Sequence, residues 1–255
     1  MNWATKRQLI YGGTVVFIIL TIIGLWLFSR FYKPPTCKDQ VQNQGELGVD
    51  CGGPCAIVCH SEIAKPVVLW SRSFQVAKGV YNAVAYIENP NQILGTMEAL
   101  YHFRLYDENN ILVAQRDGRT FIMPNEKFAI LEARIVTGER IPKRTFFEFT
   151  TSSDWVKIPN EKPLMIVRGE RASNTTTSPR IDAILQNGTL VDIHNIDVVS
   201  VAYDKEDNAI AGSATQIETL ARDSSLNLVF TWPLPFPSTP ARIEVIPRVN
   251  MFLPQ

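Results

Sequence analysis

The sequence has few of the side chains and none of the short motifs from which most active sites are built. It carries only three histidines in 255 residues. No nucleophile elbow, phosphate-binding glycine loop, zinc-protease helix or dinucleotide fingerprint occurs in it. We therefore expect a protein that is not an enzyme and that holds no resident organic cofactor.

An excess of charge of one sign is also lacking. Lysine and arginine total 25, aspartate and glutamate total 25, and the net charge is zero. Nucleic-acid binding needs a basic face, so the sequence predicts no nucleic-acid partner. Sixteen prolines and few sustained stretches of helical periodicity argue against a helical body.

Cysteine is absent after residue 59, and the four that occur are clustered: Cys37, Cys51, Cys55 and Cys59. An even, clustered set outside a membrane predicts two disulfides, and the spacing leaves three pairings open. The alternatives are a structural zinc ion, held by four thiolates or by three and His60, and free thiols.

Charge is missing from a long apolar run, residues 9–29. At a rise of roughly 1.5 Å per residue, about 20 such residues cross the hydrocarbon core of a bilayer. The run is longer than the apolar part of a cleavable signal and ends without a small-residue cleavage site. We expect a signal anchor: a short cytoplasmic tail over residues 1–8 and a transmembrane helix over residues 9–31.

Orientation follows from the cysteines, because basic residues flank both ends of the apolar run. Long domains cross a membrane largely regardless of charge, and disulfides form on the oxidising side. We therefore expect a single-pass protein of a bacterial cell membrane whose carboxyl-terminal body is extracytoplasmic.

Polar residues recur every three or four positions between the cysteines, at Asp39, Asn43, Glu46 and Asp50. Several oxygen ligands on a compact loop are the set that calcium prefers, so calcium is the candidate ion for these four residues. The simpler interpretation, which we favour, is a solvated acidic turn.

The stretch from Cys37 to Cys55 has the pattern C-x-D-G, N, E-x-G and D-C-G-G-x-C, with Gln40 in place of the first glycine. It resembles a cysteine-rich module of secreted and surface-anchored proteins. That resemblance implies an extracytoplasmic position and no known catalysis for a cysteine-rich segment over residues 32–64.

The remaining chain matches itself when shifted by 98 residues without a gap. Residues 67–69 fall on 165–167, residues 87–89 fall on 185–187, and Tyr101, Phe103 and Leu105 fall on Val199, Val201 and Tyr203. Such a repeat predicts two similar domains, over residues 65–158 and 160–255.

Each copy has the alternation of a β-strand followed by a polar turn. Tyr101, Phe103 and Leu105 alternate with more polar residues, residues 107–110 form a turn, and residues 111–114 return. The second copy repeats this with a turn at residues 204–208. The fold class we expect is mainly β: two tandem immunoglobulin-like β-sandwiches preceded by one transmembrane helix.

The first hairpin contains Phe103-Arg-Leu-Tyr-Asp107, after an asparagine-rich turn at residues 87–91. It resembles the F-x-L-Y-D domain and the related late-embryogenesis-abundant type 2 fold, which are small seven-stranded sandwiches. The resemblance covers residues 65–150, only partly extends to the second copy, and implies a binding or envelope-associated module.

Two loops are candidates for partner binding. The first is locally basic and suits acidic lipid or polymer; the second is proline-rich and carries two aromatic residues. A solvated edge and a stiff loop over the end of a sandwich are the simpler interpretations. The candidate residues are Arg134, Arg140, Lys143 and Arg144 in the first, and Trp232 and Phe236 in the second.

These observations favour a non-catalytic interaction or scaffold protein of the cell envelope, whose partner is an envelope protein or polymer. One alternative is an envelope enzyme, or an accessory enzyme subunit, with an unrecognised site. The other is a metal-binding or redox role of the cysteine-rich segment.

Overall fold

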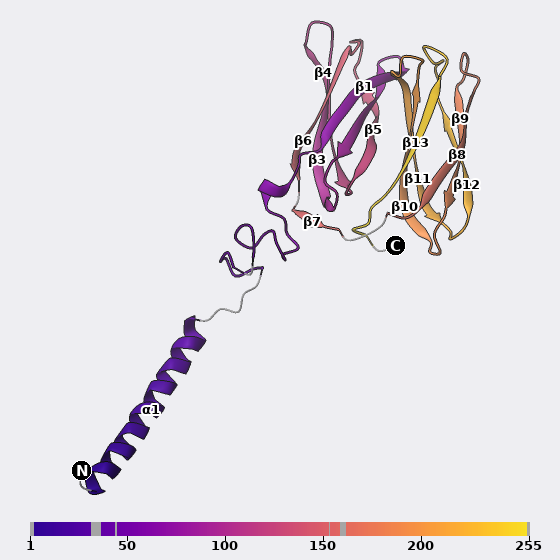
Figure 1. Cartoon of the computed structure of the whole chain (residues 1–255). Helices are drawn as coiled ribbons and strands as arrows, with labels where there is room; N and C mark the ends of the chain where they lie inside the picture. Colours follow the sequence, from indigo (N-terminus) through magenta and orange to yellow (C-terminus); the bar gives the residue numbers. More distant parts are fainter. Residues whose placement is uncertain (1–2, 32–36, 44, 153, 159–161, 254–255) are drawn as a thin grey trace. The chain divides into compact units, whose positions relative to one another are not determined.

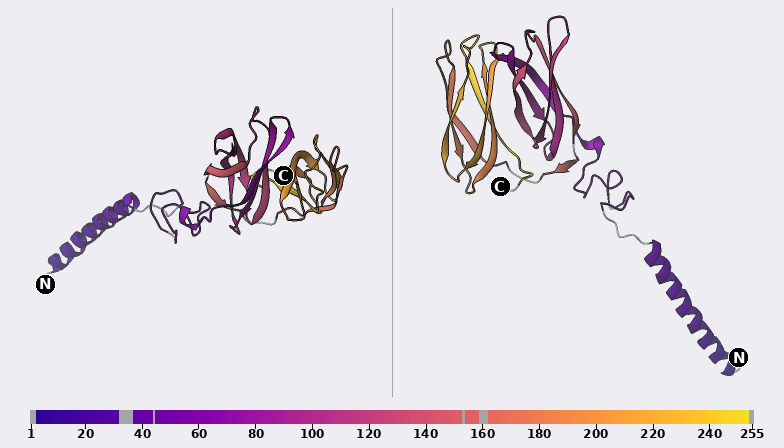
Figure 2. Two further views of the ribbon diagram at one scale, coloured as in Figure 1. Left: turned by 90° about the horizontal axis from the view of Figure 1, so that it is seen from above. Right: turned by 180° about the vertical axis from the view of Figure 1, so that it is seen from behind.

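The computed structural model describes residues 3–31, 37–43, 45–152, 154–158 and 162–253. The chain forms two compact units, Met1–Cys59 and His60–Gln255. The first contains helix α1 (Trp3–Phe31) and the cysteine-rich segment; the second contains a 3-10 turn, η1 (His60–Glu62), and every strand (Figures 1 and 2). The predicted mainly β fold with one amino-terminal apolar helix is confirmed.

Helix α1 is long and apolar enough to cross a membrane. Its segment Arg7–Arg30 has a mean hydropathy of 2.2 over 24 residues, a rise of about 36 Å against a hydrocarbon core of about 30 Å. The hydroxyls of Thr14 and Thr21 donate to the carbonyls of Ile10 and Phe17. These bonds satisfy the polar groups within the helix, as a lipid environment requires.

Two sheets make up the first half of the body. One has the order β1-β2-β5, and the other has the order β4-β3-β6, with a short strand β7 also paired to β3. The strands are β1 (Val67–Ala77), β2 (Val80–Asn89), β3 (Leu94–Tyr106), β4 (Leu112–Ile122), β5 (Glu126–Val136), β6 (Arg144–Ser152) and β7 (Trp155–Lys157). We call β1–β7 the first sandwich.

The second half repeats this order, with β8-β9-β12 as one sheet and β11-β10-β13 as the other. Among the described residues, no strand of one half pairs with a strand of the other. The strands are β8 (Met165–Ser173), β9 (Arg180–Asn187), β10 (Ile193–Tyr203), β11 (Ala209–Leu220), β12 (Ser225–Thr231) and β13 (Arg242–Val249). We call β8–β13 the second sandwich.

The predicted hairpins β3–β4 and β10–β11 are confirmed. Oδ1 of Asp107 accepts hydrogen bonds from the backbone N–H groups of residues 109 and 111, and Oδ1 of Asp204 accepts those of residues 206 and 208. An aspartate at the first turn position therefore closes both hairpins in the same way. On β3, Phe103 and Leu105 are fully buried.

A buried asparagine ties two loops together in each sandwich. Nδ2 of Asn89 donates to the carbonyls of Leu94 (2.9 Å) and Met123 (2.7 Å). Asn187, 98 residues later, donates to the carbonyls of Val191 (2.8 Å) and Leu220 (3.1 Å). Both asparagines are at most 1% exposed, so the loops that follow the second and fourth strands are fixed to each other.

The prediction of a repeat without a gap is wrong for the third strand of each sandwich, β3 and β10. Tyr106 pairs with Leu112 and Tyr203 pairs with Ala209, so β3 and β10 are related by a shift of 97, not 98. The loop before β10 is one residue shorter, as the partners of the two asparagines show. A one-residue slip moves every side chain of a strand to the opposite face.

Because of that slip, Val199, Val201 and Tyr203 do not lie in the core of the second sandwich. They join a separate buried cluster with Val84 and Ala129 of the first sandwich. The sheet β1-β2-β5 thus packs its outer face against the outer face of β11-β10-β13, and the body is a stack of four sheets (Figure 1).

Candidate functional site

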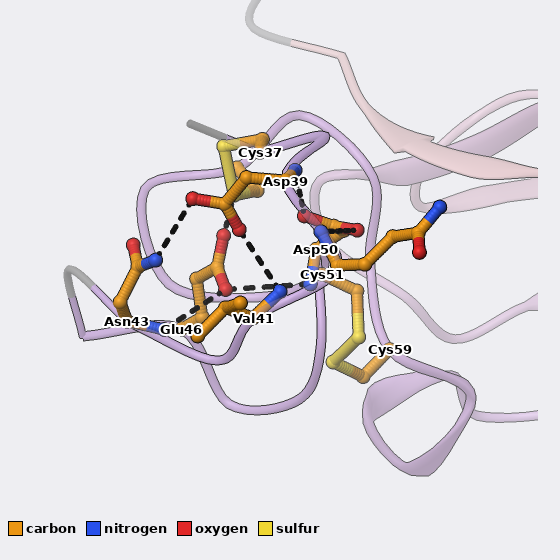
Figure 3. Close-up of a disulfide and its surroundings, with 10 residues drawn as sticks. Cys37, Asp39, Val41, Asn43, Glu46, Asp50, Cys51 and Cys59 are labelled. Atoms are coloured by element: carbon orange, nitrogen blue, oxygen red, sulfur yellow. Dashed lines mark hydrogen bonds between the residues drawn. A yellow bond between two sulfur atoms is a disulfide. The ribbon is translucent and has the colours of Figure 1, made fainter. Parts of the chain in front are cut away.

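The cysteine-rich segment is closed by two disulfides, Cys37–Cys55 and Cys51–Cys59. This is one of the three pairings that the spacing left open, and its two loops interleave because Cys51 lies inside the first loop (Figure 3). Residues 32–36 of the predicted segment lie outside the described residues.

The acidic side chains of this segment hold its backbone turns. Asp50 accepts hydrogen bonds from the backbone N–H groups of Asp39 and Gln40, each at 2.9 Å. Glu46, which is 5% exposed, accepts those of Asn43 and Asp50 at 3.3 Å (Figure 3). The four predicted calcium ligands are therefore brought together, but backbone donors already occupy several of their oxygens.

Calcium binding by these residues stays a prediction. Cys37, Glu46 and Cys55 also lie within ligand distance of one another. The two sulfurs belong to one disulfide, and zinc needs thiolates, so this group suits zinc only after reduction. Gln40, which replaces the glycine of the resembling module, has a φ of 60°, a value that glycine adopts without strain.

The predicted basic loop is exposed and lies at one end of the first sandwich. Lys143 is fixed by a 2.7 Å hydrogen bond from its N–H to the carbonyl of Tyr106. Lys143 and Arg144 line a cleft of about 550 Å³ together with Arg72 of β1. Arg140 is in the preceding loop and Arg134 lies within β5, so neither lines this cleft.

The predicted aromatic partner site at Trp232 and Phe236 is wrong. The two side chains are 6% and 8% exposed and belong to the core of the second sandwich. Their ring centroids lie 5.0 Å apart, and Nε1 of Trp232 donates to the carbonyl of Gly212. The proline-rich loop closes the end of the sandwich and presents neither aromatic ring to a partner.

Titratable side chains gather on the outer face of β4-β3-β6. His102 and Arg104 of β3 both bond Oε1 of Glu148 of β6, the latter at 2.9 Å. The hydrogen bond with His102 and the charge of Arg104 hold the pKa of the Glu148 carboxyl below its usual value. Tyr106 and Phe146 line a hollow of about 340 Å³ beside this cluster.

This cluster is satisfied by its own members. A carboxylate that already has two charged or polar donors is a weak base, so the geometry favours a fixed polar surface over proton transfer. His102 itself is only 9% exposed. Its hydrogen-bond partner, Glu148, lies on β6, so the contact could not be predicted without knowing that β3 pairs with β6.

Three residues that sequence reasoning missed, Arg248, Tyr86 and Arg72, make polar contacts between the two sandwiches. Nη2 of Arg248, which is 5% exposed, donates to the carbonyl of Phe121 (2.7 Å) and to Oε1 of Glu126 (2.8 Å). Tyr86 donates to Glu244 (2.6 Å), and Arg72 donates to Asn208 (2.8 Å). Burial and the bond to Glu244 raise the pKa of the Tyr86 hydroxyl.

No protein-family model matches the chain, and no curated protein matches it. Solved structures do match, and red sea bream transglutaminase is one of them, at 9% identity and a TM-score of 0.25. That match covers 73% of this chain and 29% of the transglutaminase chain, so this chain spans less than a third of its length. A likeness this weak carries no argument about fold or activity.

Proposed function

We propose that this protein is a non-catalytic, membrane-anchored interaction or scaffold protein of the cell envelope, with its body on the extracytoplasmic side. The observation that carries the proposal is the order of parts along the chain. A helix apolar enough to span a bilayer is followed by a doubly disulfide-bonded segment and then by a body of four stacked sheets.

Rigidity of the body supports a scaffold role. The two sandwiches share a buried apolar cluster and the polar contacts of three residues, which include the buried pair of Arg248 and Glu126. Breaking a buried ion pair by removing one partner costs about 3 kcal/mol or more. A body built in this way holds its surfaces at fixed distances, which is what a scaffold requires.

We infer that the two sandwiches arose by duplication and that the first is related to the F-x-L-Y-D domains. The equal strand order, the equivalent asparagines Asn89 and Asn187, and the equivalent turn aspartates Asp107 and Asp204 support the duplication. Phe103, Leu105 and Asp107 of the motif serve the core and the turn, so the motif marks a fold and no chemistry.

Topology is the decisive test. Protease added to intact cells or spheroplasts should remove the body, residues 60–255, and leave the anchor in the membrane. Mass mapping of the purified full-length protein without reductant should show all four cysteines in two disulfides. Full protection of the body in cells with intact membranes, or stoichiometric zinc with four free thiols, contradicts the proposal.

A further inference from the structure

Strand β6 is an edge strand whose outer edge has no partner strand among the described residues. It pairs with β3 on one side, and the sheet β4-β3-β6 ends there. Paired residues in an antiparallel ladder alternate between positions that bond the partner strand and positions that point away. The carbonyl of Thr145 accepts the hydroxyl of Ser71 from β1, so the backbone groups of Thr145, Phe147 and Phe149 point away from β3. At Thr145 this outer edge is already in contact with β1, and the free positions are those of Phe147 and Phe149.

The counterpart strand in the second sandwich is protected at the same place. Strand β13 carries Pro247 where the 98-residue shift places Phe149, and proline has no N–H to offer an added strand. Proteins protect exposed edges with proline, charge and bulges, because a bare edge recruits other strands. The sequence of β6 has three phenylalanines and no proline over residues 145–151, so its outer edge keeps the N–H group that Pro247 removes from β13.

An apolar groove follows this bare edge. We call it the edge groove: a cavity of about 450 Å³ between the start of β1 and the outer edge of β6. Its walls include Val68, Ile122, Phe147, Phe149 and Trp155. Phe147 and Trp155 are buried, whereas Val68 and Phe149 are half-buried, so additional apolar side chains have surface to cover.

Positive charge lies in the edge groove and in the neighbouring cleft along β6. Lys65 lines it near the end of β6, and Lys143 and Arg144 stand exposed at the start of β6, where they line a cleft with Arg72. The carboxylate of Glu148 is already bonded to His102 and Arg104 on the opposite face of the sheet. An occupant with acidic ends therefore matches the charge of the groove.

We propose that the edge groove binds an extended segment of a partner protein, which adds to β6 as a further strand of the sheet β4-β3-β6. The segment is apolar at alternate positions and acidic at its ends. Backbone hydrogen bonds to Phe147 and Phe149 supply affinity, and the apolar groove selects side chains on one face of the added strand. This names the partner class of the proposed scaffold function and rests on that function.

The test uses the full chain in phosphatidylcholine nanodiscs and a dye-labelled synthetic peptide of alternating valine and threonine with two aspartates at each end. The control peptide has lysines in place of the aspartates. Binding is read by fluorescence anisotropy, and hydrogen exchange locates it. The aspartate peptide should slow exchange of the backbone amides of Phe147 and Phe149 and leave those of β13 unchanged, and the lysine peptide should bind more weakly.

Variants separate backbone pairing from side-chain packing. Phe149→Pro removes the N–H of residue 149, as Pro247 does in β13. It should weaken binding by about tenfold or more, since a lost hydrogen bond that leaves a buried group unpaired costs about 1–3 kcal/mol. Phe149→Val keeps the N–H and should lose less. Thr151→Glu serves as a second variant if Phe149→Pro does not fold. It places negative charge in the edge groove and should weaken binding of the aspartate peptide. The control Thr239→Glu, on the second sandwich, should leave binding unchanged.

Three results overturn the proposal. The first is protection of the β6 edge amides before any peptide is added, since the chain itself then fills the edge groove. The second is binding that Thr151→Glu and Phe149→Pro leave unchanged, and the third is protection at β13. Because nanodiscs expose both membrane sides, these results do not depend on the topology that tests the scaffold function.

Discussion

The sheet β4-β3-β6 of the first sandwich and its counterpart β11-β10-β13 of the second have outer faces of opposite character, one polar and one apolar. The face formed by β4-β3-β6 in the first carries the hydrogen-bonded cluster of His102, Arg104 and Glu148 and is open to solvent over much of its area. The matching face of β11-β10-β13 carries Val199 and Val201 at the positions of His102 and Arg104, and it is buried against the first sandwich.

This difference shows that strand order does not determine the chemistry of a sheet face. The same topology accepts a charged face or an apolar one, and the choice follows what covers that face. The far face of the second sandwich, with Arg180 and Asp182 paired at its surface, is again polar. Polar outer faces at both ends limit the stack to four sheets, as capping units limit repeat arrays.

Exchanging matched residues between the two faces should produce the largest effect. Val201→Arg places a charge in the fully buried position between the sandwiches and should lower the free energy of unfolding by about 4 kcal/mol. Arg104→Val, the reverse exchange, removes a partly exposed ion pair and should cost less than about 1 kcal/mol. Urea unfolding of both variants, followed by tryptophan fluorescence, measures the contrast.

Equal losses from the two exchanges would show that the faces are equally covered, which contradicts the four-sheet stack. A matched control is Val201→Leu, which keeps the site apolar. It should cost about 1–3 kcal/mol through overpacking and should leave the protease resistance of the body unchanged.

The polar contact at Arg248 tests the joined faces in a second way. Arg248→Met leaves the carboxylate of Glu126, whose side chain is 10% exposed, without its cation, and should cost about 3 kcal/mol. Adding Glu126→Gln should recover part of that loss, because the double variant no longer buries an unpaired charge. Denaturation of the two single variants and the double variant gives the coupling energy; strictly additive losses would contradict a direct ion pair.

Asp197 offers a smaller, pH-dependent test of the same interface. Burial raises the pKa of its carboxyl, so the folded protein binds this proton more tightly than the unfolded chain does. Keeping the buried Asp197 carboxyl ionised lowers the free energy of unfolding. This loss is absent below the pKa of the unfolded state, grows as the pH rises towards the pKa of the folded state, and is complete above it. Asp197→Asn should therefore stabilise the body at neutral pH and give no gain at acidic pH. The gain in the free energy of unfolding should be smaller than the losses expected for Val201→Arg and Arg248→Met. A gain that does not depend on pH would argue against burial of the charged carboxyl as the cause.

Local patterns in the sequence predicted the parts of the structure that depend on local physics. The uncharged run predicted helix α1, and the alternation of Phe103 and Leu105 with polar neighbours predicted β3. The turns that begin with aspartate predicted both hairpins. Each depends on residues that are near neighbours in the chain, so one sequence is sufficient to read them.

Features that depend on distant residues could not be read in this way. The shorter loop before β10 is invisible among common apolar residues, yet it places Val201 on the interface and not in the core. Trp232 and Phe236 look like a partner surface until the core that receives them is known. Arg248 has no local signal at all, because its partners lie more than 120 residues away.

The interleaved disulfides also set how far this protein can be stretched. Without them, the chain from Cys37 to Cys59 would extend to about 75 Å under load. With both closed, the covalent path crosses from Cys37 to Cys55 and then needs only the last four residue steps, about 14 Å of chain. The two disulfides therefore set, by covalent bonds, the greatest length to which the chain between Cys37 and Cys59 can extend under load.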